Sequence, residues 1–524
     1  MPIKLITFGC RLNTYESEVI KTFLQDKEEF KNANIVIFNS CTVTSEAEKQ
    51  LRQAIRKERR ENPDAIIGVV GCAVQTNSSV YEEMEEVDFV FGNYVKMNKK
   101  NYDLLIPIIQ EKLKENKHCC CHNHKDNHEC HCHDGEHKCH CHDNEEEHEC
   151  HCHEEGHECH CHHNHNEKND FVDDEFNYDE DDDCCCDDSC CDCEEDDDFE
   201  EESKTINPIK ELNFDILDKT KPVIIDDLTD INDLDVDLIT GFEEKTRGFI
   251  QIQNGCDNHC TFCATRLARG KSISIPSNKV IEQINKLVEN GYNEIVLTGI
   301  DITDYGKRLN EDINLGKLIK KIIKETDLKR LRLSSIDIAD VNDDLKDVLF
   351  NEERLMPHIH ISLQSGDNTI LKKMARRHNR EQVIDFTNEI RKYRKNIGIG
   401  ADLIVGFPTE TEEMHKNSLR LIEEIGLVFG HIFPYSVREG TIAGRMEQVP
   451  METRRRRAKE LRELCEKQLN EFTKQQSKLP HKILIENEKV GRTENYLVVN
   501  LTKDMLKSHK IGDVVEINGF KIKN

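Results

Sequence analysis

Three cysteines stand in one short stretch, Gly255-Cys256-Asp257-Asn258-His259-Cys260-Thr261-Phe262-Cys263, shortly after the strand-like run 249–252. Protein thiolates hold iron–sulfur clusters, usually four per cluster. Three local thiolates with no obvious fourth would leave one iron open to another ligand, much as a catalytic zinc site keeps an open position. The stretch therefore predicts an iron–sulfur centre that binds a further molecule. A zinc site completed by His259 is the alternative.

Three further cysteines, Cys10, Cys41 and Cys72, each follow a predicted strand of the first domain, residues 1–117. Strands at 3–8, 35–38 and 66–70, with helices at 15–26 and 45–60 between them, predict a parallel sheet with crossover helices. Ligand sites in open α/β sheets form at the carboxyl ends of the strands, so we expect these cysteines to meet there. Three unrelated buried cysteines are the alternative.

The net charge of −30 comes from one segment of the 524-residue chain. Residues 118–202 hold 33 acidic and 3 basic residues, so the remainder carries 69 of each sign. The whole-chain charge therefore does not exclude nucleic-acid binding. No apolar run reaches the ~18 residues of a membrane helix, and the first residues show no secretory signal. We expect a cytoplasmic protein with no membrane contact, whose thiols stay reduced.

The acidic segment 118–202 also contains 17 of the 24 cysteines and 17 of the 25 histidines. The pattern His-Glu/Lys-Cys-His-Cys-His begins there at His128, His137, His148 and His157. Dense like charge and few apolar residues predict a disordered insert. Its thiols and imidazoles suit extra metal ions, and a neutral low-complexity expansion of a surface loop is the alternative.

Strands and helices alternate again in the central domain, residues 245–477. Strands are expected at 294–297, 330–333, 358–362, 400–405 and 427–433, after a first strand at 249, with helices such as 277–290 and 410–425 between them. Six such units predict an α/β fold, a partial (β/α)6 barrel. Active sites of βα barrels lie at the C-terminal strand ends, where the Cys256 loop also falls.

The Cys-x3-Cys-x-aromatic-Cys loop resembles the signature of the radical S-adenosylmethionine (SAM) enzymes. The resemblance implies a catalytic [4Fe–4S] cluster on Cys256, Cys260 and Cys263 that reduces SAM to a 5′-deoxyadenosyl radical. It also implies SAM-binding positions in the loop and at strand ends: Phe262, Gly299, Ser334, Gln364 and Gly406. After Cys263 this chain departs from the usual Ile-Ile-Pro-aromatic, with Ala264-Thr265-Arg266-Leu267 before Ala268-Arg269-Gly270.

The segments 7–18, 39–44 and 71–73, around the first three cysteines, resemble motifs of the methylthiotransferases. The Thr-Val-Thr that follows Cys41 and the segment 52–56 resemble the MtaB type, whereas the MiaB and RimO types fit less well. This likeness implies a second [4Fe–4S] cluster on Cys10, Cys41 and Cys72. It further implies addition of a methylthio group to C2 of N6-threonylcarbamoyladenosine at tRNA position 37.

Residues 478–524 are expected to form a small β-barrel that resembles the RNA-binding TRAM domain, and residues 203–244 a linker. Arg492 and Tyr496 are candidate RNA contacts, with burial of Tyr496 in the core as the alternative. The basic run 454–457 suits phosphate contact or a solvated helix face. We expect Cys465 to be structural.

The implied partners are the anticodon loop of tRNA and an electron donor such as flavodoxin or ferredoxin. Two alternatives remain. One is a methylthiotransferase with another acceptor, either isopentenyladenosine in tRNA or an aspartate of a ribosomal protein. The other is a metal-handling protein that acts through the insert.

Overall fold

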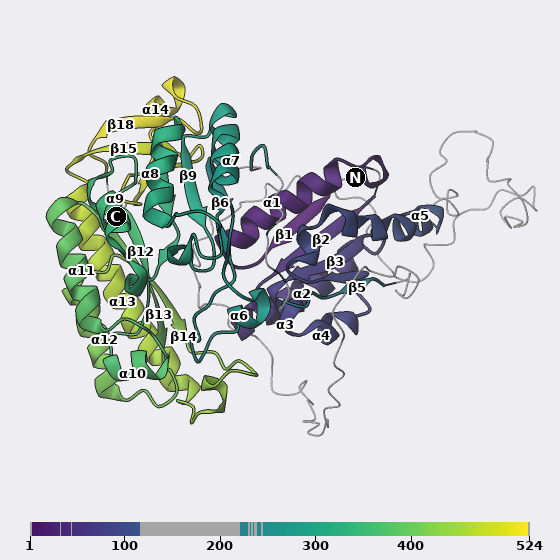
Figure 1. Ribbon diagram of the computed structural model, residues 1–524, viewed down its shortest axis with the longest axis horizontal. Coiled ribbons are helices and arrows are strands. Elements are labelled where there is room, and N and C mark those ends of the chain that lie inside the picture. The colour runs from purple at the N-terminus through teal and green to yellow at the C-terminus, as the bar shows by residue number, and fades with distance from the viewer. Residues whose placement is uncertain are drawn as a thin grey trace, which may run out of the picture. The chain divides into compact units, whose positions relative to one another are not determined.

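The structure is a computed structural model (Figure 1). It describes residues 3–31, 33–42, 44–115, 221–228, 231, 234, 238–242 and 245–521. The predicted insert at 118–202, with its expected metal ions, lies outside the described residues. Within the described residues, no helix has an apolar stretch long enough to cross a membrane.

A parallel five-stranded sheet, in the order β1-β2-β3-β4-β5, forms the N-terminal part. The three predicted strands and the crossover helices between them are confirmed. The strands are β1 Lys4–Thr7, β2 Ile35–Ser40, β3 Ile66–Gly71, β4 Phe89–Phe91 and β5 Val223–Ile224; the helices are α1 Arg11–Gln25, α2 Ser45–Glu61, α3 Cys72–Thr76, α4 Ser78–Glu82 and α5 Leu105–Glu115. β5 comes from the predicted linker and pairs with β4.

Both faces of this sheet are covered, which explains its continuous apolar strands. Along β2, Ile35 and Ile37 pack in the same core as Tyr15 of α1, whereas Val36 and Phe38 pack with α2 on the other face. Successive side chains of a strand point to opposite faces, so neither set can be polar.

Two parallel sheets form the central part, in the orders β10-β9-β6 and β11-β12-β13-β14. Only Ser334 separates β10 from β11, so the two sheets follow one another along the chain. The strands are β6 Arg247–Gln251, β9 Glu294–Thr298, β10 Arg330–Leu333, β11 Ser335–Ile336, β12 His358–Gln364, β13 Gly398–Val405 and β14 Phe429–Pro434. The helices are α6 Thr265–Arg269, α7 Ser277–Glu289, α8 Leu315–Glu325, α9 Asp343–Asn351, α10 Asn368–Lys373, α11 Arg380–Tyr393, α12 Glu412–Glu424 and α13 Met451–Gln476. A short antiparallel pair, β7 Gln253–Asn254 and β8 Ile273–Ser274, flanks the cysteine loop.

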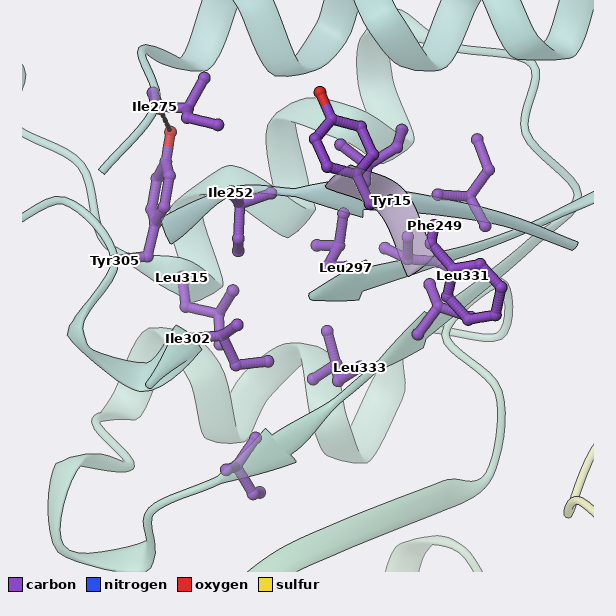
Figure 2. Packing of buried hydrophobic residues seen from close by; sticks show 14 of the residues in the cluster. Tyr15, Phe249, Ile252, Ile275, Leu297, Ile302, Tyr305, Leu315, Leu331 and Leu333 are labelled. Carbon is purple, nitrogen blue, oxygen red and sulfur yellow. Dashed lines mark hydrogen bonds between the residues drawn. The ribbon is translucent and has the colours of Figure 1, made fainter. Parts of the chain in front are cut away.

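One continuous hydrophobic core joins the N-terminal sheet to the central strands. Tyr15 of α1 belongs to the same buried cluster as Phe249 of β6, Leu297 of β9 and Leu331 of β10, and Figure 2 shows these side chains together. The two parts therefore contribute side chains to the same buried cluster.

The C-terminal segment forms a four-stranded antiparallel sheet in the order β17-β16-β15-β18. Its elements are β15 Pro480–Ile485, β16 Val490–Arg492, β17 Val498–Asn500, β18 Val514–Asn518 and the short helix α14 Lys503–Ser508. Arg330 and Arg332 of β10 donate to the carbonyl oxygen of Thr493 at 3.1 and 2.8 Å, which ties this sheet to the central strands.

Candidate active site

The loop from Gly255 to Cys263 leaves the end of β7, and all three of its cysteines are partly buried. The main-chain N–H of Asn258 points at Cys256 Sγ over 3.4 Å, and Arg376 donates to Cys260 Sγ over 3.4 Å. Hydrogen bonds to sulfur of this kind stabilise thiolates and tune iron–sulfur clusters. His259, the candidate fourth ligand for zinc, is exposed.

Gly255 allows the loop to begin where it does. Its φ is +69°, and an ideal Cβ there would lie 1.9 Å from the carbonyl oxygen of Lys271. The carbonyl oxygen of Gly270, the residue before Lys271, accepts the Cys256 N–H at 3.1 Å. The chain after α6 therefore packs directly against the start of the loop. Only glycine meets both the backbone angle and the close approach.

We expect Gly255→Ala to destabilise the protein by more than about 2 kcal/mol and to reduce its bound iron, because left-handed strain and a backbone clash add. Gly291→Ala is the matched control, since Gly291 has φ +93° but no atom within 4 Å of an ideal Cβ. Melting temperature and iron per chain would be compared for both variants. Equal melting temperatures and equal iron contents in the two variants would contradict the proposed clash at Gly255.

The other predicted SAM-binding residues lie at C-terminal strand ends, on the edge where the cysteine loop begins. Gly299 follows β9, Ser334 follows β10, Gln364 ends β12 and Gly406 follows β13. Gln364 has φ +69°, a strained conformation for a residue with a side chain and one that concentrates at functional sites. Ser334 Oγ is buried with no hydrogen-bond partner among the described residues, so it is available to a ligand.

Two glycines and an aromatic side chain shape this edge. A Cβ on Gly299 would lie 2.7 Å from the carbonyl oxygen of Gln253, beside the cysteine loop. Gly406, with φ +66°, donates its N–H to Glu410 at 3.0 Å. Phe262 packs near Phe407, with ring centroids 6.5 Å apart. The loop thus lies against the turn after β13.

Buried charges surround the cysteines of the loop. Burial, followed by the charge of Asp301, raises the pKa of Cys256 to about 12, and the other two cysteines of the loop add to the rise. Burial and neighbouring carboxylates raise the pKa of Asp301 itself to about 6. Burial would also raise the pKa of Asp337, but a hydrogen bond to His378 and the charge of Arg376 lower it to about 2. Several negative groups thus converge here, as expected where a cation or cationic ligand binds.

The second set of cysteines lies at the C-terminal ends of β1, β2 and β3, as predicted. Cys10 precedes the first residue of α1, Cys41 follows β2, and Cys72 begins α3. At Gly9, with φ +98°, an ideal Cβ would lie 2.6 Å from Cys41 Sγ, so the loop before Cys10 directly contacts Cys41. The three strands bring the cysteines to one sheet edge.

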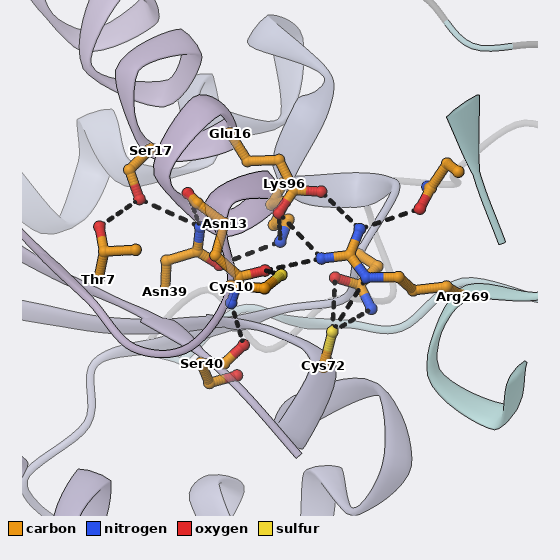
Figure 3. A network of polar contacts seen from close by, with 12 residues as sticks. Thr7, Cys10, Asn13, Glu16, Ser17, Asn39, Ser40, Cys72, Lys96 and Arg269 are labelled. Atoms are coloured by element: carbon orange, nitrogen blue, oxygen red, sulfur yellow. Dashed lines mark hydrogen bonds and ion pairs between the residues drawn. The ribbon is translucent and has the colours of Figure 1, made fainter. Parts of the chain in front are cut away.

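Arg269 connects the two parts of the site (Figure 3). It ends α6, shortly after the Cys256 loop, yet its Nε donates to Cys72 Sγ over 3.2 Å. Its terminal nitrogens contact Glu16 at 2.7 and 3.1 Å and Asn13 at 2.7 Å, both on α1. Lys96 also pairs with Glu16, at 2.7 Å. Although burial would raise the pKa of Glu16, these two cations lower it to about 2.

Sequence reasoning missed the roles of Arg269 and Arg376. It also missed a polar group on three neighbouring strands, in which Asp402 lies 3.0 Å from His360 and 3.2 Å from His431. Charged residues within apolar strands and next to a metal-binding motif are the signal that could have found them, because such residues are rarely buried without a partner.

Several predicted RNA contacts are wrong. Arg454 is buried and donates to main-chain oxygens, and Arg457 is buried against Glu410 at 2.7 Å. Arg492 is also buried, and Tyr496 stacks on His358 with ring centroids 4.3 Å apart. These side chains are buried because each hydrogen-bonds, pairs or stacks with another buried group. The alternative of a buried Tyr496 is confirmed, and Cys465 is buried as predicted.

Comparison with known proteins agrees with this architecture. The radical SAM superfamily matches residues 250–422, and the uncharacterised protein family UPF0004 matches residues 2–92. The central fold and its cysteine loop therefore define a radical SAM enzyme, a class that uses a [4Fe–4S] cluster and SAM.

Several relatives match this chain over nearly its whole length. The threonylcarbamoyladenosine tRNA methylthiotransferase MtaB of Rickettsia prowazekii is 37% identical, over 95% of this chain and 91% of that protein. MtaB of Bacillus subtilis is 28% identical over 98% and 93%. A tRNA-2-methylthio-N(6)-dimethylallyladenosine synthase of Finegoldia magna is 24% identical over 99% and 93%. The chain belongs to the MtaB family of radical SAM methylthiotransferases.

Proposed function

We propose that this enzyme adds a methylthio group to C2 of N6-threonylcarbamoyladenosine at position 37 of tRNA. The observation that carries the proposal is the pairing of two cysteine triads, each at the C-terminal edge of a parallel sheet, within one continuous core. The chain also spans nearly the whole length of the MtaB relatives it matches.

In this proposal Cys256, Cys260 and Cys263 hold the catalytic [4Fe–4S] cluster. The donor set fits, since all three thiols are partly buried, Cys256 accepts an N–H group from Asn258 and Cys260 accepts one from Arg376. When bound, the cluster and SAM supply a radical that can break an inert C–H bond, which acid–base groups cannot do.

The chain's own residues orient SAM and exclude water. Phe262 packs near Phe407, the residue after Gly406, and Gly299 lies against the carbonyl oxygen of Gln253 just before the cysteine loop. Gln364 ends β12 at the same edge. Asp301, 3.9 Å from Cys256 Sγ, is placed to accept a cationic group of the ligand. Such shielding limits side reactions of a radical.

Cys10, Cys41 and Cys72 would hold the second [4Fe–4S] cluster, which supplies the sulfur. Two of these thiols are buried, and Asn93 and Arg269 both donate to Cys72 Sγ, at 3.5 and 3.2 Å. Hydrogen bonds to the sulfur ligands are among the features that tune an iron–sulfur cluster.

The finer fold assignments belong to the same proposal. We place residues 1–117 as the N-terminal domain, 245–477 as a six-stranded partial barrel and 478–524 as a TRAM-like domain that contacts tRNA. The insert at 118–202 is an addition to this plan, whereas the linker at 203–244 supplies strand β5 to the N-terminal sheet. An electron donor such as flavodoxin or ferredoxin would reduce the clusters.

Mass spectrometry of tRNA nucleosides tests the function. The anaerobically prepared enzyme with SAM and reductant is expected to convert N6-threonylcarbamoyladenosine in tRNA to its 2-methylthio form, and tRNA carrying isopentenyladenosine is the control substrate. A chain lacking residues 118–202 is expected to retain the activity. Methylthiolation of the control tRNA alone would refute the proposed acceptor.

A further inference from the structure

Arg269 and the glycine that follows it each contact one of the two cysteine sites, and Figure 3 shows the contact of Arg269 with Cys72. Its side chain reaches Cys72 Sγ, and the carbonyl oxygen of the next residue, Gly270, accepts the N–H of Cys256 at 3.1 Å. The preceding carbonyl, that of Ala268, accepts from Asn93, which itself lies 3.5 Å from Cys72 Sγ. Three consecutive residues therefore link a sulfur of one triad to the main chain of the other.

Hydrogen bonds hold the guanidinium group of Arg269 in one orientation. A guanidinium has five N–H donors in a rigid fork. Arg269 makes five such contacts, one to Cys72, two to Glu16, one to Asn13 and one to Asn254, and its side chain is 1% exposed. The position of its charge relative to Cys72 is therefore fixed by three other residues, Glu16, Asn13 and Asn254.

This buried network carries a net positive charge. Arg269 and Lys96 are two cations, and Glu16 is the one carboxylate between them, with all three side chains at most 1% exposed. In a dry interior such a charge acts strongly on its neighbours. It favours the more negative, reduced state of a cluster beside it, as hydrogen bonds to the cluster's sulfur ligands do.

We propose that Arg269 is a positioning residue that raises the reduction potential of the cluster on Cys10, Cys41 and Cys72 and holds that cluster in fixed register with the Cys256 loop. The inference rests on the proposed function, since it presupposes the second cluster. Reduction adds one electron to the cluster from the reductant, and no bond to Arg269 forms or breaks.

The test is a redox titration with dithionite and mediators, followed by electron paramagnetic resonance. It uses the full chain with Cys256, Cys260 and Cys263 all replaced by alanine. The cluster proposed on these three cysteines then does not contribute to the signal. Arg269→Gln removes the charge, and Arg269→Lys keeps the charge but loses the Nε–H contact. Arg266→Gln, one turn earlier on α6 and partly exposed, is the matched control.

The midpoint potential is expected to fall in Arg269→Gln, to fall less in Arg269→Lys and to stay unchanged in Arg266→Gln. With the barrel cysteines restored, methylthio transfer by Arg269→Gln should fall about 10- to 100-fold, as for other residues that orient metal ligands. If Arg269→Gln does not fold, the lysine variant carries the test, because it retains the buried charge.

Two results would overturn the proposal in distinguishable ways. A cluster that titrates at the parental potential in both Arg269 variants would refute the role of Arg269 alone. Absence of any cluster on Cys10, Cys41 and Cys72 in the parent chain would refute the second cluster, and with it both the proposed function and this inference.

Discussion

Cys10→Ala is expected to abolish methylthio transfer while leaving cleavage of SAM to 5′-deoxyadenosine intact, whereas Cys256→Ala should abolish both. The physical reason is the separation of the two triads. Cys10, Cys41 and Cys72 end three strands of the N-terminal sheet, and Cys256 belongs to the loop after β7. Losing one thiolate of three removes a cluster ligand, and the methyl group of alanine cannot replace it.

Each variant would be assayed anaerobically for two products, 5′-deoxyadenosine and the methylthiolated nucleoside. The expected loss of the second product is at least about 100-fold in both variants, as for removal of a group essential to the chemistry. Cys465→Ala is the control, because Cys465 is buried on α13 and belongs to neither triad.

Which of the two products each variant loses shows whether the two cysteine triads have the separate roles proposed. If Cys10→Ala also stops SAM cleavage, while circular dichroism and melting temperature match those of the parent, the two triads do not act separately. If Cys256→Ala still cleaves SAM, the catalytic cluster lies elsewhere.

Glu294→Ala is expected to lower the free energy of unfolding by about 3–5 kcal/mol, the usual cost of leaving buried charges unpaired. Glu294 on β9 is fully buried and pairs with Arg330 at 2.7 Å and Arg332 at 2.8 Å. Both arginines also donate to the carbonyl oxygen of Thr493, the residue that follows strand β16 of the C-terminal sheet. Removing the carboxylate would leave the buried guanidinium groups of Arg330 and Arg332 without their ion-pair partner. It would also weaken the attachment of the C-terminal sheet.

Denaturant unfolding of Glu294→Ala would be compared with that of Glu325→Ala, an exposed glutamate at the end of α8. The control should change stability by less than about 0.5 kcal/mol. A similar small change in Glu294→Ala would show that the arginines find other partners. Loss of the C-terminal sheet alone would appear as a separate early transition.

The same residue predicts a pH dependence. Burial would raise the pKa of Glu294, but Arg332, Arg330 and Arg247 lower it to about 2 from an ordinary 4.5. A depressed carboxyl pKa adds stability above the unfolded value, and that stability is lost as pH falls toward the folded value. Wild type should therefore lose about 3 kcal/mol between pH 5 and 2 that Glu294→Gln does not lose.

Motif spacing and strand periodicity predicted most of the fold and both cysteine sets. Cys10, Cys41 and Cys72 were placed at the correct sheet edge because each lies within three residues of a strand's C-terminal end, and parallel strands end at one edge. The fifth strand, Val223–Ile224, was not predicted, since two residues have no periodicity and pair with β4 across a long stretch of chain.

The class of chemistry could be predicted from local spacing alone, because three thiols at spacings of four and three residues must lie in one loop whatever the rest of the chain does. Which charged residues face inward depends instead on how distant segments pack together. Arg269 and Glu16 lie far apart in the chain, and Arg454, Arg457, Arg492 and Tyr496 resemble surface residues by type. Burial depends on partners brought from distant segments, and local composition does not specify those partners.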